Sequence, residues 1–82
     1  MPSARVRLPD KLETLLRGEM EIAIYQANLG EFDSQVAHKY LIDQIPQIDI
    51  AAELGYERSA ISKRIQRIME KVELAAVKLN LC

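Results

Sequence analysis

The sequence is short of the residues that build disulfide frameworks, β-rich folds and aromatic cores. Its 82 residues include one cysteine, no tryptophan, three glycines and three prolines. A single thiol cannot form a disulfide within one chain, so we expect a reducing, cytoplasmic location. Scarce glycine and proline argue against a loop-rich or all-β chain. Because Ile, Leu, Val and Ala must then fill the core, helices packed on helices are the favoured architecture.

The sequence also lacks the groups that enzymes and metal sites need. His38 stands alone and Cys82 is the last residue, so neither has a second ligand at metal-binding spacing. There is no glycine-rich phosphate loop, and the carboxylates are dispersed at helix-surface spacings. We therefore expect no catalytic activity, no metal and no cofactor. No signal peptide is apparent and no apolar run could span a bilayer, so we expect a soluble protein with no membrane partner.

Charge is nearly balanced over the whole chain but is distributed unevenly along it. The formal net charge of −1 argues against a protein that coats nucleic acid indiscriminately, without excluding a specific binder. Acidic residues dominate the middle of the chain, and a basic cluster follows that is opposed only by Glu70. The cluster consists of Arg58, Lys63, Arg64, Arg67 and Lys71.

A short arm and a long first helix are predicted at the beginning of the chain. Residues 1–8 show no periodicity and are interpreted as a flexible basic arm. Pro9 suits the first position of a helix, which we expect to run to about Asn28 with Gly30 as its stop. The apolar surface of this helix is wider than one neighbouring helix normally covers. Contact with a further partner is therefore expected there.

Three more helices are predicted after the first. The second spans about 32–44, with Asp33 or Ser34 as its cap, and the residue before Pro46 ends it because proline disfavours α geometry there. A short third helix is expected over 47–54, and a longer fourth begins at 58 or 59 and continues towards 79. The predicted fold is all-α: one domain over residues 9–82, a small four-helix domain with a long C-terminal helix.

The stretch from 47 to 66 carries the most informative pattern. Two short helices that cross steeply through a three- or four-residue turn need a small side chain where their backbones approach, and Ala51 supplies it. The turn needs a residue that tolerates a left-handed backbone, and Gly55 does so at little cost. Apolar side chains fall at inward positions of both helices. They are Ile50, Leu54, Ile61 and Ile65.

This stretch resembles the helix-turn-helix of phage Cro and repressor proteins. The match runs over 47–66 and includes Gln47, Ala51, Leu54-Gly55 and the Ser59-Ala60-Ile61 run that ends in Ile65. Extended back to Lys39 and forward to Val72, it is also similar to region four of bacterial sigma factors. The resemblance implies a sequence-specific regulator of transcription that binds double-stranded DNA. The size and motif also resemble regulators of phages and other mobile elements.

The second helix of the motif is expected to be the recognition helix, over about 58–68. At roughly 100° per residue, Ile65 and Ile68 fall within about 40° of Ile61, so the opposite face is short, polar and cationic, as a major-groove helix requires. The resemblance implies base contacts from the start of this helix and phosphate contacts nearby. The base-contacting candidates are Arg58, Ser59, Ser62, Lys63 and, further along, Gln66. The backbone-contacting candidates are Gln47, Arg64 and Arg67.

An apolar stripe at alternating spacings of four and three continues past the motif. It comprises Ile61, Ile65, Ile68, Val72, Ala75 and Leu79. One interpretation is that the stripe packs on the chain's own first helix; the other is a dimer seam made from the end of the fourth helix, the first helix, or both. We favour a homodimer, since the apolar surface exceeds what a small bundle can hide. Such a dimer would hold two recognition helices roughly 34 Å apart.

Two other functions remain open on the sequence alone. The first is a sigma-like accessory factor that contacts RNA polymerase as well as promoter DNA, with the acidic first and second helices as its protein-binding surface. The second is a helix-turn-helix retained only for protein–protein assembly. Salt-dependent DNA binding separates a transcription regulator or an accessory factor from a helix-turn-helix used only for assembly, because phosphate contacts release counterions.

Overall fold

A computed structural model describes residues 10–13 and 15–80, and this part of the chain is helical with no strand. In chain order its elements are α1 (Asp10–Glu13), α2 (Arg17–Gln26), α3 (Glu31–Ala37), the π-helical segment η1 (His38–Ile42), α4 (Gln47–Leu54) and α5 (Arg58–Lys78). The predicted all-α class with a long C-terminal helix is confirmed. The basic arm predicted for residues 1–8 and the thiol of Cys82 lie outside the described residues.

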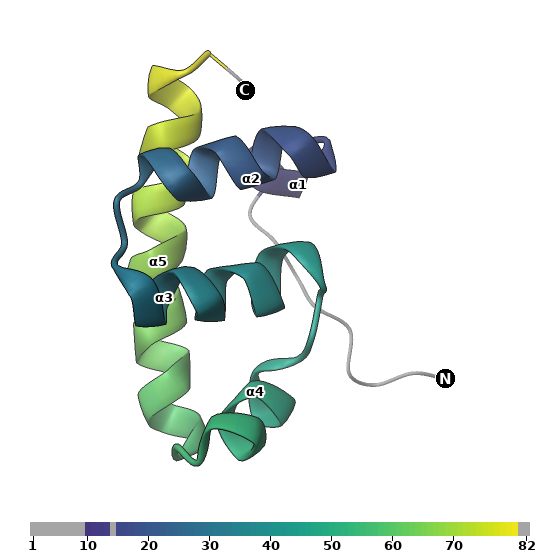
Figure 1. Cartoon of the computed structure of the whole chain (residues 1–82), viewed down its shortest axis with the longest axis vertical. Helices are drawn as coiled ribbons and strands as arrows, with labels where there is room; N and C mark the ends of the chain where they lie inside the picture. The colour runs from purple at the N-terminus through teal and green to yellow at the C-terminus, as the bar shows by residue number, and fades with distance from the viewer. Residues whose placement is uncertain (1–9, 14, 81–82) are drawn as a thin grey trace.

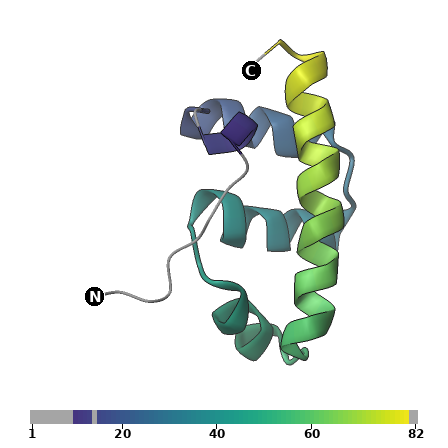
Figure 2. The same cartoon turned by 180° about the vertical axis from the view of Figure 1, so that it is seen from behind.

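Helix α5 is the element on which the rest of the fold is assembled. It spans 21 residues, and α2, α3 and α4 each pack against it at successive levels along its length (Figure 1). From behind, α5 is seen along its whole length with no other helix in front of it (Figure 2). One face of α5 is therefore covered by the other helices and the opposite face is open.

The covered face of α5 is the apolar stripe that the sequence predicts. Ile61, Ile65, Ile68 and Val72 are all at most 2% exposed. They share one core with buried side chains from the other helices. These are Met20, Ala23 and Ile24 of α2, Val36 and Ala37 of α3, and Ile50 and Ala51 of α4. The stripe is thus used inside the chain, as the first of the two interpretations had it, and burial of its apolar side chains stabilises the fold.

The single first helix predicted for residues 9–28 is wrong, because the chain breaks between α1 and α2. Leu16 has extended backbone geometry, and its N–H donates to a carboxylate oxygen of Glu19 over 2.9 Å, which starts α2 afresh. Leu12 on α1 is fully buried, and Met20 on α2 is 4% exposed. The break allows both side chains to reach the core from separate segments.

The residue that closes α2 is also different from the one expected. The helix ends at Gln26, and Asn28 takes the left-handed backbone conformation with φ of 55°. Asparagine adopts this conformation more readily than other residues with a Cβ, because its short amide bonds locally. Gly30, the predicted stop, instead has φ of 92° and immediately precedes α3.

The second helix follows its predicted range but differs at both ends. Neither Asp33 nor Ser34 caps it, since α3 begins one residue earlier at Glu31 with no side-chain cap. The helix then widens into η1, where the Asp43 N–H donates to the His38 carbonyl over 3.0 Å. Such widened turns are rare, and hydrophobic periodicity carries no signal for them.

The membrane-spanning potential of the helices is low. Within residues 10–13 and 15–80, none of the helices combines the length and the apolar character that crossing a bilayer requires.

Candidate nucleic-acid interface

Helices α4 and α5 are joined by a three-residue turn with the boundaries that the sequence predicts. Gly55 ends α4 in the left-handed conformation, with φ of 75° and ψ of 29°. The N–H of Tyr56 donates to the Ala51 carbonyl over 2.9 Å, which satisfies a backbone acceptor at the end of α4. Helix α5 then starts at Arg58. The two helices are consequently separate elements rather than one continuous rod.

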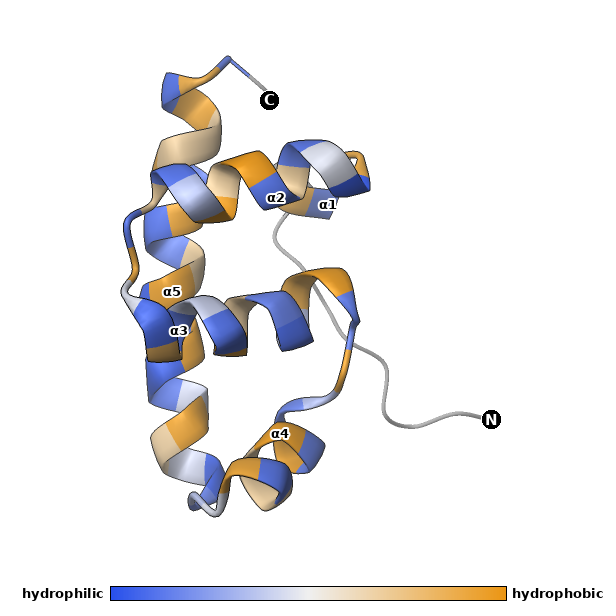
Figure 3. Cartoon of the chain, viewed as in Figure 1, coloured by the Kyte–Doolittle hydropathy of each residue, from blue (hydrophilic) through white to orange (hydrophobic). Residues whose placement is uncertain are grey.

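The angle between α4 and α5 is stabilised by apolar side chains that they share. Ile50 and Ile61 are fully buried, and Ala51 is 3% exposed. The apolar sides of α4 and α5 therefore face a shared core. The first half of α5 presents its opposite, polar side to solvent. The hydropathy pattern agrees, with apolar residues of α4 and α5 interleaved by polar ones (Figure 3).

Five of the eight predicted site residues are exposed, and four of these five lie on the open face of α5. Arg58, Ser59, Lys63, Gln66 and Arg67 are exposed. The other three, Gln47, Ser62 and Arg64, are half-buried. Positions 59, 63, 66 and 67 fall on one side of the helix, because its repeat is 3.6 residues, whereas Arg58 at the first position of α5 points to another side. The fold thus brings one guanidinium group, one ammonium group and two uncharged polar side chains together on one exposed surface, which we call the α5 basic face.

Arg64 is paired with a residue of the same chain rather than lying on the α5 basic face. Its Nη1 donates to Asp33 Oδ1 over 2.6 Å, and its guanidinium carbon lies 4.8 Å from the centre of the Phe32 ring. The Phe32 ring in turn contacts Tyr56, with 5.4 Å between the ring centres. This cluster joins α3 to α5 and to the turn before α5. The sequence pattern does not predict this cluster, because no local spacing relates positions 31 residues apart.

A second ion pair neutralises another carboxylate close to the turn. Lys39 Nζ lies 3.2 Å from a carboxylate oxygen of Glu53, which joins η1 to α4. By contrast, Arg58, Lys63 and Arg67 have no ion pair with any residue in 10–13 or 15–80. Glu53 and Asp33 are therefore paired within the chain, whereas Lys63 and Arg67 on the α5 basic face remain available to an external anion.

Gln47, the predicted site residue at the start of α4, lies beside Tyr40. The side-chain amide of Gln47 donates to the Tyr40 hydroxyl over 3.5 Å, a long contact that leaves the amide half-buried. Ile48 at the start of α4 and Tyr56 in the α4–α5 turn are not among the predicted site residues, and they are 56% and 45% exposed. In the sequence, only their positions next to Gln47 and Gly55 could have indicated that these two residues belong to the site.

Comparisons with protein-family models, with curated proteins and with solved structures found no match.

Proposed function

We propose that the protein binds double-stranded DNA sequence-specifically and regulates transcription, with the first half of α5 in the major groove. The observation that carries the proposal is the α5 basic face, on which Lys63 and Arg67 are exposed and lack an acidic partner among the described residues, with Arg58 exposed and equally unpaired at the start of the helix. Arginine and lysine neutralise phosphates and displace their counterions. Ser59 and Gln66 lie between them and offer hydrogen bonds to base edges.

Helix α4 has a supporting role in this proposal. Its buried Ile50 and Ala51 hold α5 at a defined angle, and Gln47 lies at the helix start, where backbone N–H groups attract phosphate. The major groove is about 12 Å wide, which admits one helix with its side chains. The proposed role is binding alone, so no reaction is assigned to any side chain.

A salt series on DNA binding tests the proposal. We expect the affinity for a labelled duplex to fall steeply as KCl rises, and the slope of log K against log salt to decrease by about one unit in Lys63→Ala and in Arg67→Ala. Arg17→Ala is the matched control, because Arg17 is an exposed cation on α2, outside the α5 basic face. Equal slopes in all four proteins would contradict the proposal.

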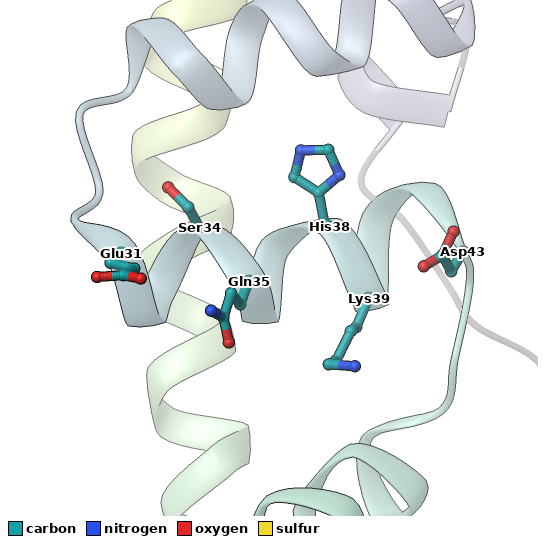
Figure 4. A pocket seen from close by; sticks show the side chains of 6 residues that line it. All are labelled: Glu31, Ser34, Gln35, His38, Lys39 and Asp43. Carbon is teal, nitrogen blue, oxygen red and sulfur yellow. The ribbon is translucent and has the colours of Figure 1, made fainter.

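Contact with RNA polymerase is a second candidate function, and a different surface supports it. Ile22 and Tyr25 on α2 are 51% and 81% exposed and lie one turn apart. A shallow groove runs over α3 and η1, and Figure 4 shows side chains standing along it. The groove is lined by Glu31, Ser34, Gln35, His38, Lys39 and Asp43. Exposed apolar side chains on α2 and a polar groove on α3 and η1 are both features that suit a protein partner.

Pull-down with purified RNA polymerase separates an accessory factor from a free-standing regulator. An accessory factor should be retained by the polymerase and released by the double substitution of Ile22 and Tyr25 with alanine. Ile48→Ala on α4 is the control, since it removes a similarly exposed apolar side chain elsewhere. A protein that binds neither polymerase nor DNA, yet assembles with another protein, would support the remaining alternative of a helix-turn-helix used only for assembly.

A further inference from the structure

The second half of α5 exposes an apolar strip that none of the described helices covers. Leu74 and Val77 lie one turn apart and are 61% and 44% exposed. Together with Glu70 and Glu73 they line a shallow groove. Leu74 and Val77 fall on the side of α5 opposite the buried stripe of Ile61, Ile65, Ile68 and Val72, because a helix repeats every 3.6 residues. This is the side of α5 that no other helix covers in Figure 2. Exposed leucine and valine side chains in adjacent turns gain free energy when a partner helix covers them.

We propose that this strip is the contact surface for a second copy of the chain, with the two α5 helices parallel. The proposal deepens the homodimer expected above and rests on the proposed DNA binding for its orientation. In a parallel pair, Leu74 meets Leu74 and Val77 meets Val77 of the second copy around a two-fold axis along the helices. We call the surface over residues 73–78 the α5 seam.

The charges that flank the apolar strip favour the parallel orientation. Glu73 and Lys78 lie on opposite flanks of the strip, five residues apart. A two-fold axis along the helices brings opposite flanks together, so each Glu73 meets Lys78 of the second copy and two attractive pairs form. An antiparallel pair brings like flanks together, which sets Lys71 against Lys78 of the second copy. Repulsion between these ammonium groups disfavours that arrangement.

The parallel orientation also agrees with the position of the α5 basic face. Both α5 N-terminal halves then lie at the same end of the dimer, where one duplex can meet them, whereas an antiparallel pair would direct them to opposite ends. Ahead of Leu74, the open side of α5 carries Glu70, Arg67 and Lys63. Like charges would face each other there in a parallel pair, so the two helices diverge ahead of Glu73, which separates the Glu70 side chains and leaves Lys63 and Arg67 free for phosphate.

The small size of the α5 seam sets the expected strength of the dimer. Two apolar side chains per copy bury far less than the roughly 1,000 Å² expected of a stable protein–protein interface. The free chains should therefore associate weakly. Binding of both copies to one duplex raises their effective concentration, so the dimer should be strongly favoured on DNA that carries two half-sites.

Charge exchange between Glu73 and Lys78 tests the pairing by sedimentation equilibrium of the full chain. Glu73→Lys and Lys78→Glu should each weaken self-association about tenfold, because both attractive pairs become repulsive. A 1:1 mixture of these two variants, and the double variant, should restore association. Asp43→Lys, an exposed change on another element, should leave association unchanged. A chain that stays monomeric at high concentration, or variants that all associate alike, would overturn the proposal.

Disulfide trapping tests the parallel orientation directly. In a Cys82→Ser background, a Val77→Cys variant should cross-link with itself under mild oxidation, because a parallel pair places the two Val77 positions within disulfide reach. Cross-linking that appears only when Leu74→Cys and Val77→Cys chains are mixed would overturn the parallel arrangement.

DNA titration of the same charge variants separates failure of the seam from failure of the proposed function. The Glu73→Lys protein should bind a single half-site with the salt dependence of the unmodified chain, and lose its preference for paired half-sites. Loss of salt-dependent binding by the unmodified chain would refute the DNA proposal itself. Retained preference for paired half-sites in Glu73→Lys would refute the seam alone.

Discussion

Arg64 on α5 and Asp33 on α3 form an ion pair with 2.6 Å between Nη1 and Oδ1. The pair joins two helices that are far apart in sequence, and the stacking of the guanidinium on Phe32 extends the contact. Its consequence is twofold. It ties the first half of α5 to the body of the protein, and it holds inside the fold one of the two arginines that the sequence assigns to phosphate contacts.

Loss of this contact should reduce stability modestly. We expect Arg64→Gln and Asp33→Asn each to lower the free energy of unfolding by about 1 kcal/mol, since the side chains are 41% and 24% exposed and solvent screens the pair. Urea denaturation of the single and double variants measures the coupling between the two positions, which should be about 0.5–1 kcal/mol. Strictly additive effects would show that the pair contributes nothing.

The same arginine should matter little for DNA affinity compared with its neighbour. Arg67→Gln should reduce the salt slope of binding by about one unit and leave stability nearly unchanged, because the Arg67 side chain is exposed and unpaired among the described residues. Arg64→Gln should leave the salt slope nearly unchanged and lower the stability. A salt-titration series paired with thermal denaturation distinguishes the two. Equal slope losses would return Arg64 to the DNA contacts predicted from sequence.

Glycine substitutions should act in opposite directions at two positions. Gly55→Ala should destabilise the protein by about 1 kcal/mol, because φ of 75° is strained for a residue with a Cβ. Gly18→Ala lies in the first turn of α2, where an added methyl group meets no atom within 4 Å, and should stabilise by up to about 1 kcal/mol. In a domain of this size each change shifts the melting temperature by about 4–8 °C. A stabilising Gly55→Ala would refute the left-handed turn.

Truncation of the core of α5 should be far more costly than truncation of an exposed side chain of the same type. Ile65 is 1% exposed and Ile48 is 56% exposed. We expect Ile65→Ala to cost about 2–5 kcal/mol, because it leaves a cavity, and Ile48→Ala to cost under about 1 kcal/mol. Far-UV circular dichroism during urea titration measures both. A tolerated Ile65→Ala would mean that α5 packs on a different face.

Base recognition and phosphate recognition should separate between two residues of the α5 basic face. Gln66→Ala should reduce the ratio of specific to non-specific affinity, with a cost of about 1–3 kcal/mol on the preferred site, and leave the salt slope unchanged. Lys63→Ala should reduce the slope. Selection of duplexes from a random pool supplies the preferred site, and competition with unrelated DNA gives the ratio. Identical behaviour of the two variants would argue against base contacts from Gln66.

Local patterns were sufficient to predict much of this fold. The spacing of Ile61, Ile65 and Ile68 fixes the inward face of α5 because a helix repeats every 3.6 residues. Gly55 ends α4 for an equally local reason, since only a residue without a Cβ adopts a left-handed backbone without strain. The ranges of α4 and α5 and the open position of Lys63 and Arg67 follow from these two constraints.

Other features depended on contacts between distant parts of the chain. The break that separates Leu12 from Met20 exists because both side chains must reach one core, and helix propensity along 9–28 contains no trace of it. Aspartate is a residue type that commonly caps helices, yet the position of α5 makes Asp33 the partner of Arg64.

Sequence by itself determined the ranges of α4 and α5, where the turn between them falls and which side of α5 is apolar, because these depend on backbone preference and periodicity within a few residues. Tertiary structure alone decided which charges are neutralised internally and which stay open to a partner. An ion pair requires two side chains within about 4 Å, and for residues 31 positions apart only the packing of the helices sets that distance.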